Sequence, residues 1–303
     1  MTPRSDRGQA TILTLVFLVV LLGMAALVLD LGSWYRSDRA TQAAADASAL
    51  AGAQALPQNP GAANTLALQY ASKNGGGNST VTVSSGVLTN DTIKVQLTRP
   101  AEGFFAKLFG VNSVTVGSKA TARATVMSEA KYVAPIGVNL AHPKLKGSAL
   151  CPCFGAGNTT TLPLGKTGVP GGFDVINIDS SHGGTGPSTL AGWILKGLDA
   201  YMPLGEYYSD AGAKWNSSQI GNALDSRIGT DLLFPVYDVV VGNGSNAQYH
   251  VVGWVGFHLT GHQESGSDGT ITGWFTEVVW TGIQATTSNG LPNLGARAVQ
   301  LID

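Results

Sequence analysis

Residues 10–29 read ATILTLVFLVVLLGMAALVL, a run without a charged side chain whose polar groups are threonine hydroxyls. A helix needs about 20 such residues to cross the hydrocarbon core of a bilayer, which is about 30 Å thick. A helix satisfies its own backbone hydrogen bonds, so it is stable inside lipid. The run therefore predicts one transmembrane helix over residues 10–29.

The charges that flank this run determine its orientation only weakly. Arg4 and Arg7 precede it, and Arg36 and Arg39 follow it, so both sides carry the same number of basic residues. The N-terminal tail is very short, however, and the remainder of the chain is long and polar. These lengths favour a cytoplasmic tail over residues 1–9 and an exported bulk.

Two other interpretations compete with a retained anchor. A cleaved secretory signal has an apolar core of about 7–15 residues followed by a small-residue cleavage site, whereas this run is longer and continues through Asp30 into more helical sequence. A core helix of a soluble protein would need a matching apolar partner, and no later segment resembles one. A retained anchor is the preferred interpretation.

The helix is predicted to continue beyond the apolar run. The stretch Ala40–Ala55 is very rich in alanine, the best helix former, and Pro57 and Pro60 then end the helix. A helix over residues 10–56 would be about 70 Å long. The small side chains of residues 30–56 suit close packing against other helices, and a plain helical stalk is the equally open alternative.

Composition limits the function classes. Charged residues make up 12 % of the 303 residues and the formal net charge is -1, so the chain offers little electrostatic attraction to nucleic acid. A hydrophobic content of 44 % argues against global disorder. The low charge and the 40 glycines suit an exported β-rich protein.

The two cysteines, Cys151 and Cys153, lie on either side of Pro152. Two thiols without a nearby histidine are too few ligands for a zinc site. In an oxidising compartment they would close a small local disulfide, and a redox-active pair is the alternative. The local disulfide is the simpler interpretation.

Residues 57–128 are predicted to form a small α+β module. Its strands alternate apolar and polar side chains with a period of two, so each can bury one face. The elements expected, in chain order, are a helix over Ala62–Ser72, strands over Ser79–Ser85 and Thr92–Thr98, a short amphipathic helix over Glu102–Gly110, and a strand over Ser113–Met127.

Residues 129–303 are predicted to form a β-rich domain. It begins with an irregular segment, Leu140–Gly172, of a length that usually means function or disorder. Three strands close it as an antiparallel meander, with hairpin chemistry at Gly242–Asn246. The elements expected are a strand at FDVINID (173–179), helices over Pro187–Leu198 and Ser217–Ile228, and the meander strands Leu232–Val241, Ala247–Thr260 and Thr270–Ala285.

The histidines of the C-terminal region have a structural interpretation. His250 and His258 share a strand face but lie about 26 Å apart along an extended chain, too far to share a metal. His258 and His262 have the four-residue spacing of a helical zinc motif, but the glutamate of that motif is missing because Leu259 follows His258. We expect strand-face histidines.

Other candidate sites are weaker. Asp174, Asp179 and His182 around Ser180 and Ser181 suggest a hydrolase cluster, but no Gly-x-Ser-x-Gly elbow frames either serine, and a polar loop is the simpler interpretation. No phosphate-binding loop is found. We therefore predict no catalytic, cofactor-binding or metal-binding residue.

Five tryptophans lie in the C-terminal region, and they are predicted to be buried in its core. An exposed group would instead make a surface for a partner or a carbohydrate. They are Trp193, Trp215, Trp254, Trp274 and Trp280.

The stretch from Arg7 to Leu56 resembles the N-terminal domain of the TadE/TadG-like family of Flp pilus-assembly proteins. In that family an apolar span leads into a D-x-G step, an aromatic residue and a Q-x-A-A-D-A-x-A-L-A-G-A run. The matching residues here are Asp30 and Gly32, Trp34 and Tyr35, and Gln42–Ala53 with Asp46 inside. Residues 227–261 also resemble C-terminal regions of such proteins.

The chain departs from the family pattern in two places. Prepilin-like members carry a glutamate five residues after the cleavage glycine; Gly8 would be that glycine, and Leu13 occupies the position. This argues against processing by a prepilin peptidase. Some members carry an Asp-x-Ser-x-Ser metal site, but Asp179-Ser180-Ser181-His182-Gly183 has glycine at its last position.

The resemblance implies a non-enzymatic structural or assembly component of a bacterial Flp/Tad pilus. It would sit in the cytoplasmic membrane by a single span, with partners among other pilus components and with itself through the Ala-rich helix. A surface adhesin on the same anchor, using the 140–172 loop and the tryptophans, is the alternative. An anchored hydrolase ranks third.

Overall fold

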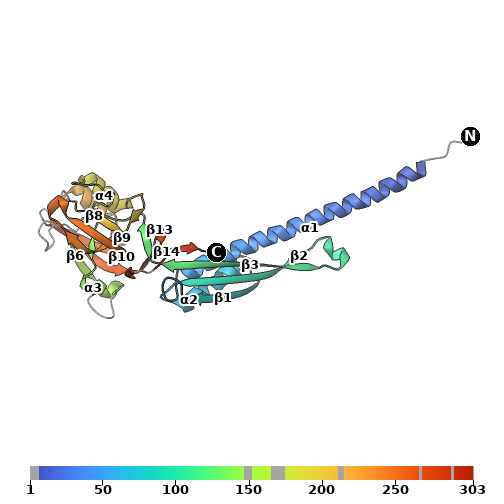
Figure 1. The fold of residues 1–303 in the computed structure, drawn as a ribbon, viewed down its shortest axis with the longest axis horizontal. Helices are drawn as coiled ribbons and strands as arrows, with labels where there is room; N and C mark the ends of the chain where they lie inside the picture. Colours follow the sequence, from blue (N-terminus) through green and yellow to red (C-terminus); the bar gives the residue numbers. More distant parts are fainter. Residues whose placement is uncertain are drawn as a thin grey trace, which may run out of the picture. The chain divides into compact units, whose positions relative to one another are not determined.

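The computed structural model describes residues 7–146, 152–164, 175–210, 215–265, 268–287 and 290–302. The fold is mixed α+β, with a long apolar N-terminal helix followed by β-rich sheets (Figure 1), so the predicted fold class is confirmed. The chain divides into two compact units. Unit 1 comprises Met1–Gly86, Asn90–Arg123 and Leu301–Asp303, and unit 2 comprises Val87–Thr89 and Ala124–Gln300.

Unit 1 begins with α1 (Arg7–Ala53), an uninterrupted helix of 47 residues that appears as the blue coil in Figure 1. It is about 70 Å long, as the sequence predicts. A short turn leads to α2 (Pro60–Lys73), which begins with a proline in its first turn. The side chain of Asn59 caps α2 by accepting a hydrogen bond from the backbone N–H of Ala62 at 2.9 Å.

An antiparallel sheet in the order β1-β2-β3 completes unit 1. Its strands are β1 (Asn78–Ser84), β2 (Thr92–Glu102) and β3 (Ser113–Thr125), and β2 pairs with β3 from Thr92↔Arg123 to Glu102↔Ser113. A short 3₁₀ helix, η1 (Ala106–Phe109), lies at the tip of the β2–β3 hairpin. The predicted strand–strand–helix–strand order is confirmed, with a 3₁₀ helix where the sequence predicts an amphipathic helix.

The Ala-rich half of α1 is buried inside unit 1. Ala45, Ala49 and Ala53 are fully buried on α1, and α1 packs against both α2 and β2. The facing side chains are also small or aliphatic: Ala63, Ala67 and Ala71 from α2, and Ile93, Val95 and Leu97 from β2. This stretch is therefore neither a stalk nor a free packing face, because its small residues form the core of its own unit.

Unit 2 is built on a curled sheet in the order β5-β9-β10-β11-β6, with β8 paired to β10. The predicted meander is confirmed as β9-β10-β11, joined by antiparallel pairing. The strands of this sheet are β5 (Val138–Asn139), β6 (Thr160–Leu164), β8 (Gly205–Tyr208), β9 (Asp231–Val241), β10 (Gln248–Ser265) and β11 (Asp268–Thr276).

The remaining strands and helices after β3 are shorter. A three-stranded sheet has the order β13-β4-β7, and β12 pairs with β14 in parallel. The strands are β4 (Met127–Ala130), β7 (Met202–Pro203), β12 (Val278–Val279), β13 (Gly282–Gln284) and β14 (Ala296–Leu301). The helices are α3 (Pro143–Lys146), η2 (Ala156–Asn158), α4 (Pro187–Lys196), α5 (Ser218–Asp225) and η3 (Gly244–Asn246).

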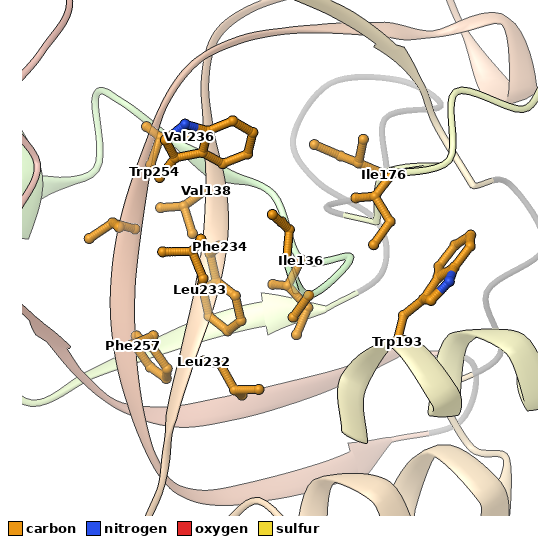
Figure 2. Close-up of a cluster of buried hydrophobic side chains, with 14 of the residues drawn as sticks. Ile136, Val138, Ile176, Trp193, Leu232, Leu233, Phe234, Val236, Trp254 and Phe257 are labelled. Atoms are coloured by element: carbon orange, nitrogen blue, oxygen red, sulfur yellow. The ribbon is translucent and has the colours of Figure 1, made fainter. Parts of the chain in front are cut away.

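The core of unit 2 lies on the inner face of the curled sheet. Figure 2 shows side chains of β5, β9, β10 and α4 gathered in one cluster. The rings of Phe234 and Phe257 stack with centroids 5.3 Å apart, and Phe275 of β11 meets Phe257 edge-on at 5.5 Å. Large apolar side chains on three neighbouring strands therefore hold the meander together.

The tryptophans are mostly core residues, as predicted. Trp193, Trp215 and Trp254 are buried, and Trp280 is half-buried against the core. Trp274 is half-buried as well, and its ring stacks on that of His258 with centroids 4.4 Å apart. The tryptophans therefore offer no exposed binding groove on the described part of the chain.

Three sequence predictions for unit 2 are wrong in detail. The FDVINID segment is not a strand where it is described: Val175 and Ile176 make only isolated bridges, to Ile136 and Ser209. The segment 140–172 is not wholly irregular, because it contains α3, η2 and β6, while 147–151 and 165–172 lie outside the described residues. The last meander strand ends at Thr276, and β13 joins a different sheet.

Gly52 tests the close packing of α1. A Cβ atom there would lie 2.9 Å from the carbonyl oxygen of Ala63 and 3.1 Å from Cβ of Ala67. We expect Gly52→Ala to destabilise unit 1 by about 1–3 kcal/mol, because the backbone of α2 must move away. Thermal unfolding of the detergent-solubilised chain measures the loss, and hydrogen exchange in α2 localises it.

Gly32→Ala is the matched control on the same helix. Nothing lies within 4 Å of a Cβ atom at this position, so the gain in helix propensity, up to about 1 kcal/mol, should be the only effect. Equal stabilisation by both substitutions would contradict close packing at Gly52.

Candidate functional site

The first half of α1 exposes apolar side chains on all sides. The most apolar part of the helix has a mean hydropathy of 3.1, and none of it is buried. Leu13 is 72 % exposed and Val28 is 66 % exposed. Soluble monomers rarely expose contiguous apolar surface on this scale. By length and composition, α1 can cross a membrane.

Asp30 is the first charged residue after this apolar surface, and it is 4 % exposed. Its carboxylate accepts hydrogen bonds from three successive backbone N–H groups at the tip of the β2–β3 hairpin. Oδ1 accepts from Phe104 at 2.6 Å and from Phe105 at 3.1 Å, and Oδ2 accepts from Phe105 at 3.1 Å and from Ala106 at 2.5 Å. We call this set of contacts the Asp30 clasp.

The clasp supplies what the start of a short helix lacks. The first N–H groups of a helix have no partner within the helix, and η1 has no capping side chain of its own. The carboxylate of Asp30 on α1 supplies the missing hydrogen-bond acceptor, although it lies 74 to 76 residues earlier in the chain. A negative charge at the positive end of a helix is also electrostatically favourable.

The contacts of the clasp change the acidity of Asp30. Burial alone would raise the pKa of this carboxyl, but the backbone N–H groups of Phe104, Ala106 and Phe105 outweigh it and hold the pKa below its ordinary value. Asp30 therefore carries its negative charge at neutral pH, and that charge is held by hydrogen bonds rather than by a basic side chain.

Residues of α1 that follow Asp30 also form hydrogen bonds to the sheet of unit 1. Arg99 of β2 donates from Nη2 to the carbonyl of Ser37 at 2.9 Å. Gln42 donates from Nε2 to Asp46 Oδ1 at 2.7 Å and to the carbonyl of Lys119 on β3 at 3.1 Å. The isolated Asp46 of the alanine block thus orients a glutamine that bridges α1 to the sheet.

A groove lies between α1 and the hairpin tip. Val28, Leu29, Gly32 and Phe104 are among the residues that line it. Its lining is mostly apolar on the side of the predicted span, and Arg36 lies at its other end. This groove and the Asp30 clasp are the features of unit 1 that sequence reasoning missed.

The segment around Ser180, Ser181 and His182, for which the sequence predicts a polar loop rather than a hydrolase site, is a hydrogen-bonded loop of unit 2. The amide of Asn177 donates to the carbonyls of Ser181 and Gly183, at 3.2 and 2.6 Å. His182 Nε2 lies 2.9 Å from Asn246 Oδ1, and Asp179 accepts from the backbone N–H of Ser181 at 3.0 Å. Asp174 lies outside the described residues.

Ser180 lies beside Tyr207, whose phenol is a structural group. Burial raises the pKa of Tyr207 to about 12, against the opposing effect of a hydrogen bond with Ser180. The Tyr207 hydroxyl donates to the carbonyl of Pro203 at 2.6 Å. It therefore stays protonated at neutral pH and acts as a hydrogen-bond donor.

Three histidines of β10 each contact an aspartate. The His250–Asp238 and His258–Asp231 pairs are 2.7 Å apart, and the His262–Asp225 pair is 3.0 Å apart. A bulge between Leu259 and Gly261 shifts the register, so His258 lies opposite Trp274 and His262 opposite the buried Ile271. His258 and His262 therefore point to opposite faces of the sheet. In the described residues, no group of three or more metal-ligating side chains forms a candidate metal site.

Cys153 is disulfide-bonded. Its backbone N–H donates to the carbonyl of Lys144 at 2.8 Å. The chain has one other cysteine, Cys151, which lies outside the described residues. The bonded state of Cys153 agrees with a local disulfide formed in an oxidising compartment.

The Asp30 clasp predicts a specific pH dependence. Because the folded pKa lies below the ordinary 3.8, the stabilisation is fully present above that value and is lost as the pH falls through the folded pKa. We expect wild type to melt a few degrees above Asp30→Asn at pH 7, with the gap closing below pH 3.8. Thermal melts of both detergent-solubilised proteins across this range test it, and a gap of equal size at low pH would contradict it.

Comparison with known proteins identifies the N-terminal part of the chain. The family model described as "Putative Flp pilus-assembly TadE/G-like" matches residues 8–55, which span the apolar surface, Asp30 and the alanine block. No curated protein and no solved structure matches the chain. The predicted family resemblance is confirmed: residues 8–55 form a Tad domain of the TadE/G-like Flp pilus-assembly family.

Proposed function

We propose that this protein is a membrane-anchored, non-enzymatic structural or assembly component of a Flp/Tad pilus system. In this role it is similar to a minor pilin and acts through protein–protein contacts. One observation carries the proposal: the Tad domain coincides with α1, whose first half exposes apolar surface and whose second half is the core of unit 1. Anchor and folded unit thus share one unbroken helix.

The proposed topology is a single pass through the bacterial cytoplasmic membrane. Residues 1–9 form the cytoplasmic tail, 10–29 the span and 30–56 its helical extension, and the modules 57–128 and 129–303 are exported to the periplasm or the cell surface. The disulfide of Cys153 supports export, because disulfides persist in oxidising compartments. Leu13, in place of the glutamate of prepilins, supports an uncleaved N-terminus.

The proposed partners are other components of the pilus system and further copies of this chain. The buried alanines of α1 are already used inside unit 1. The surface that remains for partners includes the apolar first half of α1 and the exposed side chains on the two flanks of α2, among them Leu68 and Tyr70, which are 42 % and 41 % exposed. Helix packing between copies would therefore occur through residues 10–29.

The state of the N-terminus tests the proposal most directly. Mass spectrometry of the mature chain from native membranes and from sheared surface filaments should find an uncleaved N-terminus in the membrane fraction. A chain that begins at Gln9 in filaments would mean processing as a pilin-like subunit, which contradicts an uncleaved anchor. A chain cleaved after the apolar run would contradict the anchor itself.

Site-specific photocrosslinking tests the partners. A benzoyl-phenylalanine at Leu68 of α2 or at Leu21 of the span should crosslink to proteins of the Tad system in native membranes. Both side chains are exposed within unit 1, so substitution leaves its core intact. A matched sample without irradiation is the control. Crosslinks that reach no Tad-system protein from either position would count against the assembly role.

A further inference from the structure

We propose that the tip of the β2–β3 hairpin inserts into the lipid interface of the same membrane that α1 spans. The tip is the segment Phe104–Phe109, and its exposed apolar side chains are Phe104, Phe105, Leu108 and Phe109. This inference rests on the proposed membrane anchoring of α1. It gives the protein a second, non-helical membrane contact on the exported side.

The tip exposes large apolar side chains at the end of a hairpin. Phe104 is 69 % exposed, Phe105 40 %, Leu108 81 % and Phe109 84 %. Nothing in the described part of unit 1 covers Leu108 or Phe109, although both belong to the ordered η1 helix. Large apolar side chains gathered at one point on a surface mark a protein or membrane interaction site.

The clasp fixes where the tip lies along α1. Asp30 follows the last residue of the span and binds the backbone of Phe104, Phe105 and Ala106. The tip is therefore held beside the end of the span, at the level where the hydrocarbon core gives way to headgroups. A hairpin tip at that level meets lipid without any further movement.

The apolar surfaces of span and tip are continuous. Val28 and Leu29 of α1 line the same groove as Phe104 and Phe105. Val28 and Leu29 are 66 % and 56 % exposed. A bilayer around residues 10–29 surrounds these two side chains, so it also reaches the phenylalanines that lie against them. This continuity identifies lipid as the occupant of the groove.

Polar and aromatic residues at the same level match a membrane interface. Tyr35 follows the span by about one turn and is 64 % exposed, and tyrosines concentrate at headgroup level. Arg36 lines the groove, and Lys107 within η1 is paired with Glu102 at 2.7 Å. Arg36 and the Lys107–Glu102 pair thus make this level polar, as the headgroup region requires, and Arg36 supplies a positive charge there.

The clasp also explains how a carboxylate is tolerated at this depth. An ionised aspartate at the edge of the hydrocarbon is costly unless hydrogen bonds satisfy it. The three N–H groups of the tip satisfy Asp30, and the same contact brings the phenylalanines to the lipid. The Asp30 clasp therefore satisfies the carboxylate at the end of the span and holds the tip beside the span.

Spin labelling of the full chain in vesicles tests the proposal. Phe109→Cys and Leu108→Cys variants are labelled separately and reconstituted in vesicles of phosphatidylethanolamine and phosphatidylglycerol. Collision rates of each label with oxygen and with a water-soluble nickel complex then report its depth. We expect both tip labels to collide more with oxygen than with nickel, as a label in lipid does.

Two control positions separate the possible outcomes. A label at Leu22→Cys lies in the span and should collide more with oxygen, the result called a lipid reading here. A label at Thr82→Cys lies on the exposed face of β1 and should collide more with nickel, a water reading. Tip labels that read as water while Leu22→Cys reads as lipid overturn this inference and leave the anchor standing. A Leu22→Cys label that reads as water overturns the anchor and, with it, the inference.

A protein partner at the tip would give a different signal. Tip labels shielded from both oxygen and nickel would indicate a protein contact. If their spectra also broadened, and narrowed on dilution with unlabelled protein, the contact would be with a second copy of the chain. Either result overturns insertion into lipid. Unchanged line shapes on dilution, together with oxygen-dominated collisions, support it.

Discussion

Unit 1 depends on the close approach of α1 to its neighbours, which only very small side chains permit. Ala45, Ala49 and Ala53 are fully buried where α1 meets α2 and β2, and Gly52 leaves no room for even a methyl group beside the backbone of α2. Interiors pack at nearly crystalline density, so larger side chains here would push the layers apart. The positions of the sheet and of the hairpin tip follow from this approach.

Two contacts fix α1 against the rest of unit 1: the packing of its alanines and the Asp30 clasp. Packing fixes the second half of α1 against the sheet, and the clasp fixes the end of its apolar half against the hairpin tip. Between them, Ser37 and Gln42 bond to β2 and β3. Polar contacts therefore recur along α1 from Asp30 to the alanine block, and they hold the helix in one register on the sheet.

Features that depend on local pattern could be predicted from the sequence. The apolar run, the helix that continues to Ala53, the strands β1, β2 and β3 and the β9-β10-β11 meander each show a pattern that a short stretch of residues reveals. The Tad motif was recognisable for the same reason, because its residues are contiguous.

Features that depend on distant partners could not be predicted. The partners of Asp30 lie more than 70 residues away, and an alanine stretch has no apolar stripe that would show which face is buried. The bulge after Leu259 turns His262 to the other face of the sheet, which a strict period of two misses. The edge strand β6 pairs with β11 across a long separation along the chain, so the sequence alone predicts an irregular segment there.

The unbroken helix has a mechanical consequence. Since α1 runs from the apolar half into the core of unit 1 without a hinge, tension applied at its N-terminal end is transmitted along a rigid rod and loads its contacts with α2 and β2 in shear. Under a shear load, all contacts of α1 with α2 and β2 oppose the applied tension at the same time, so they do not break one after another. A flexible linker at residue 30 would decouple the two halves, whereas this chain places a buried, hydrogen-bonded carboxylate there.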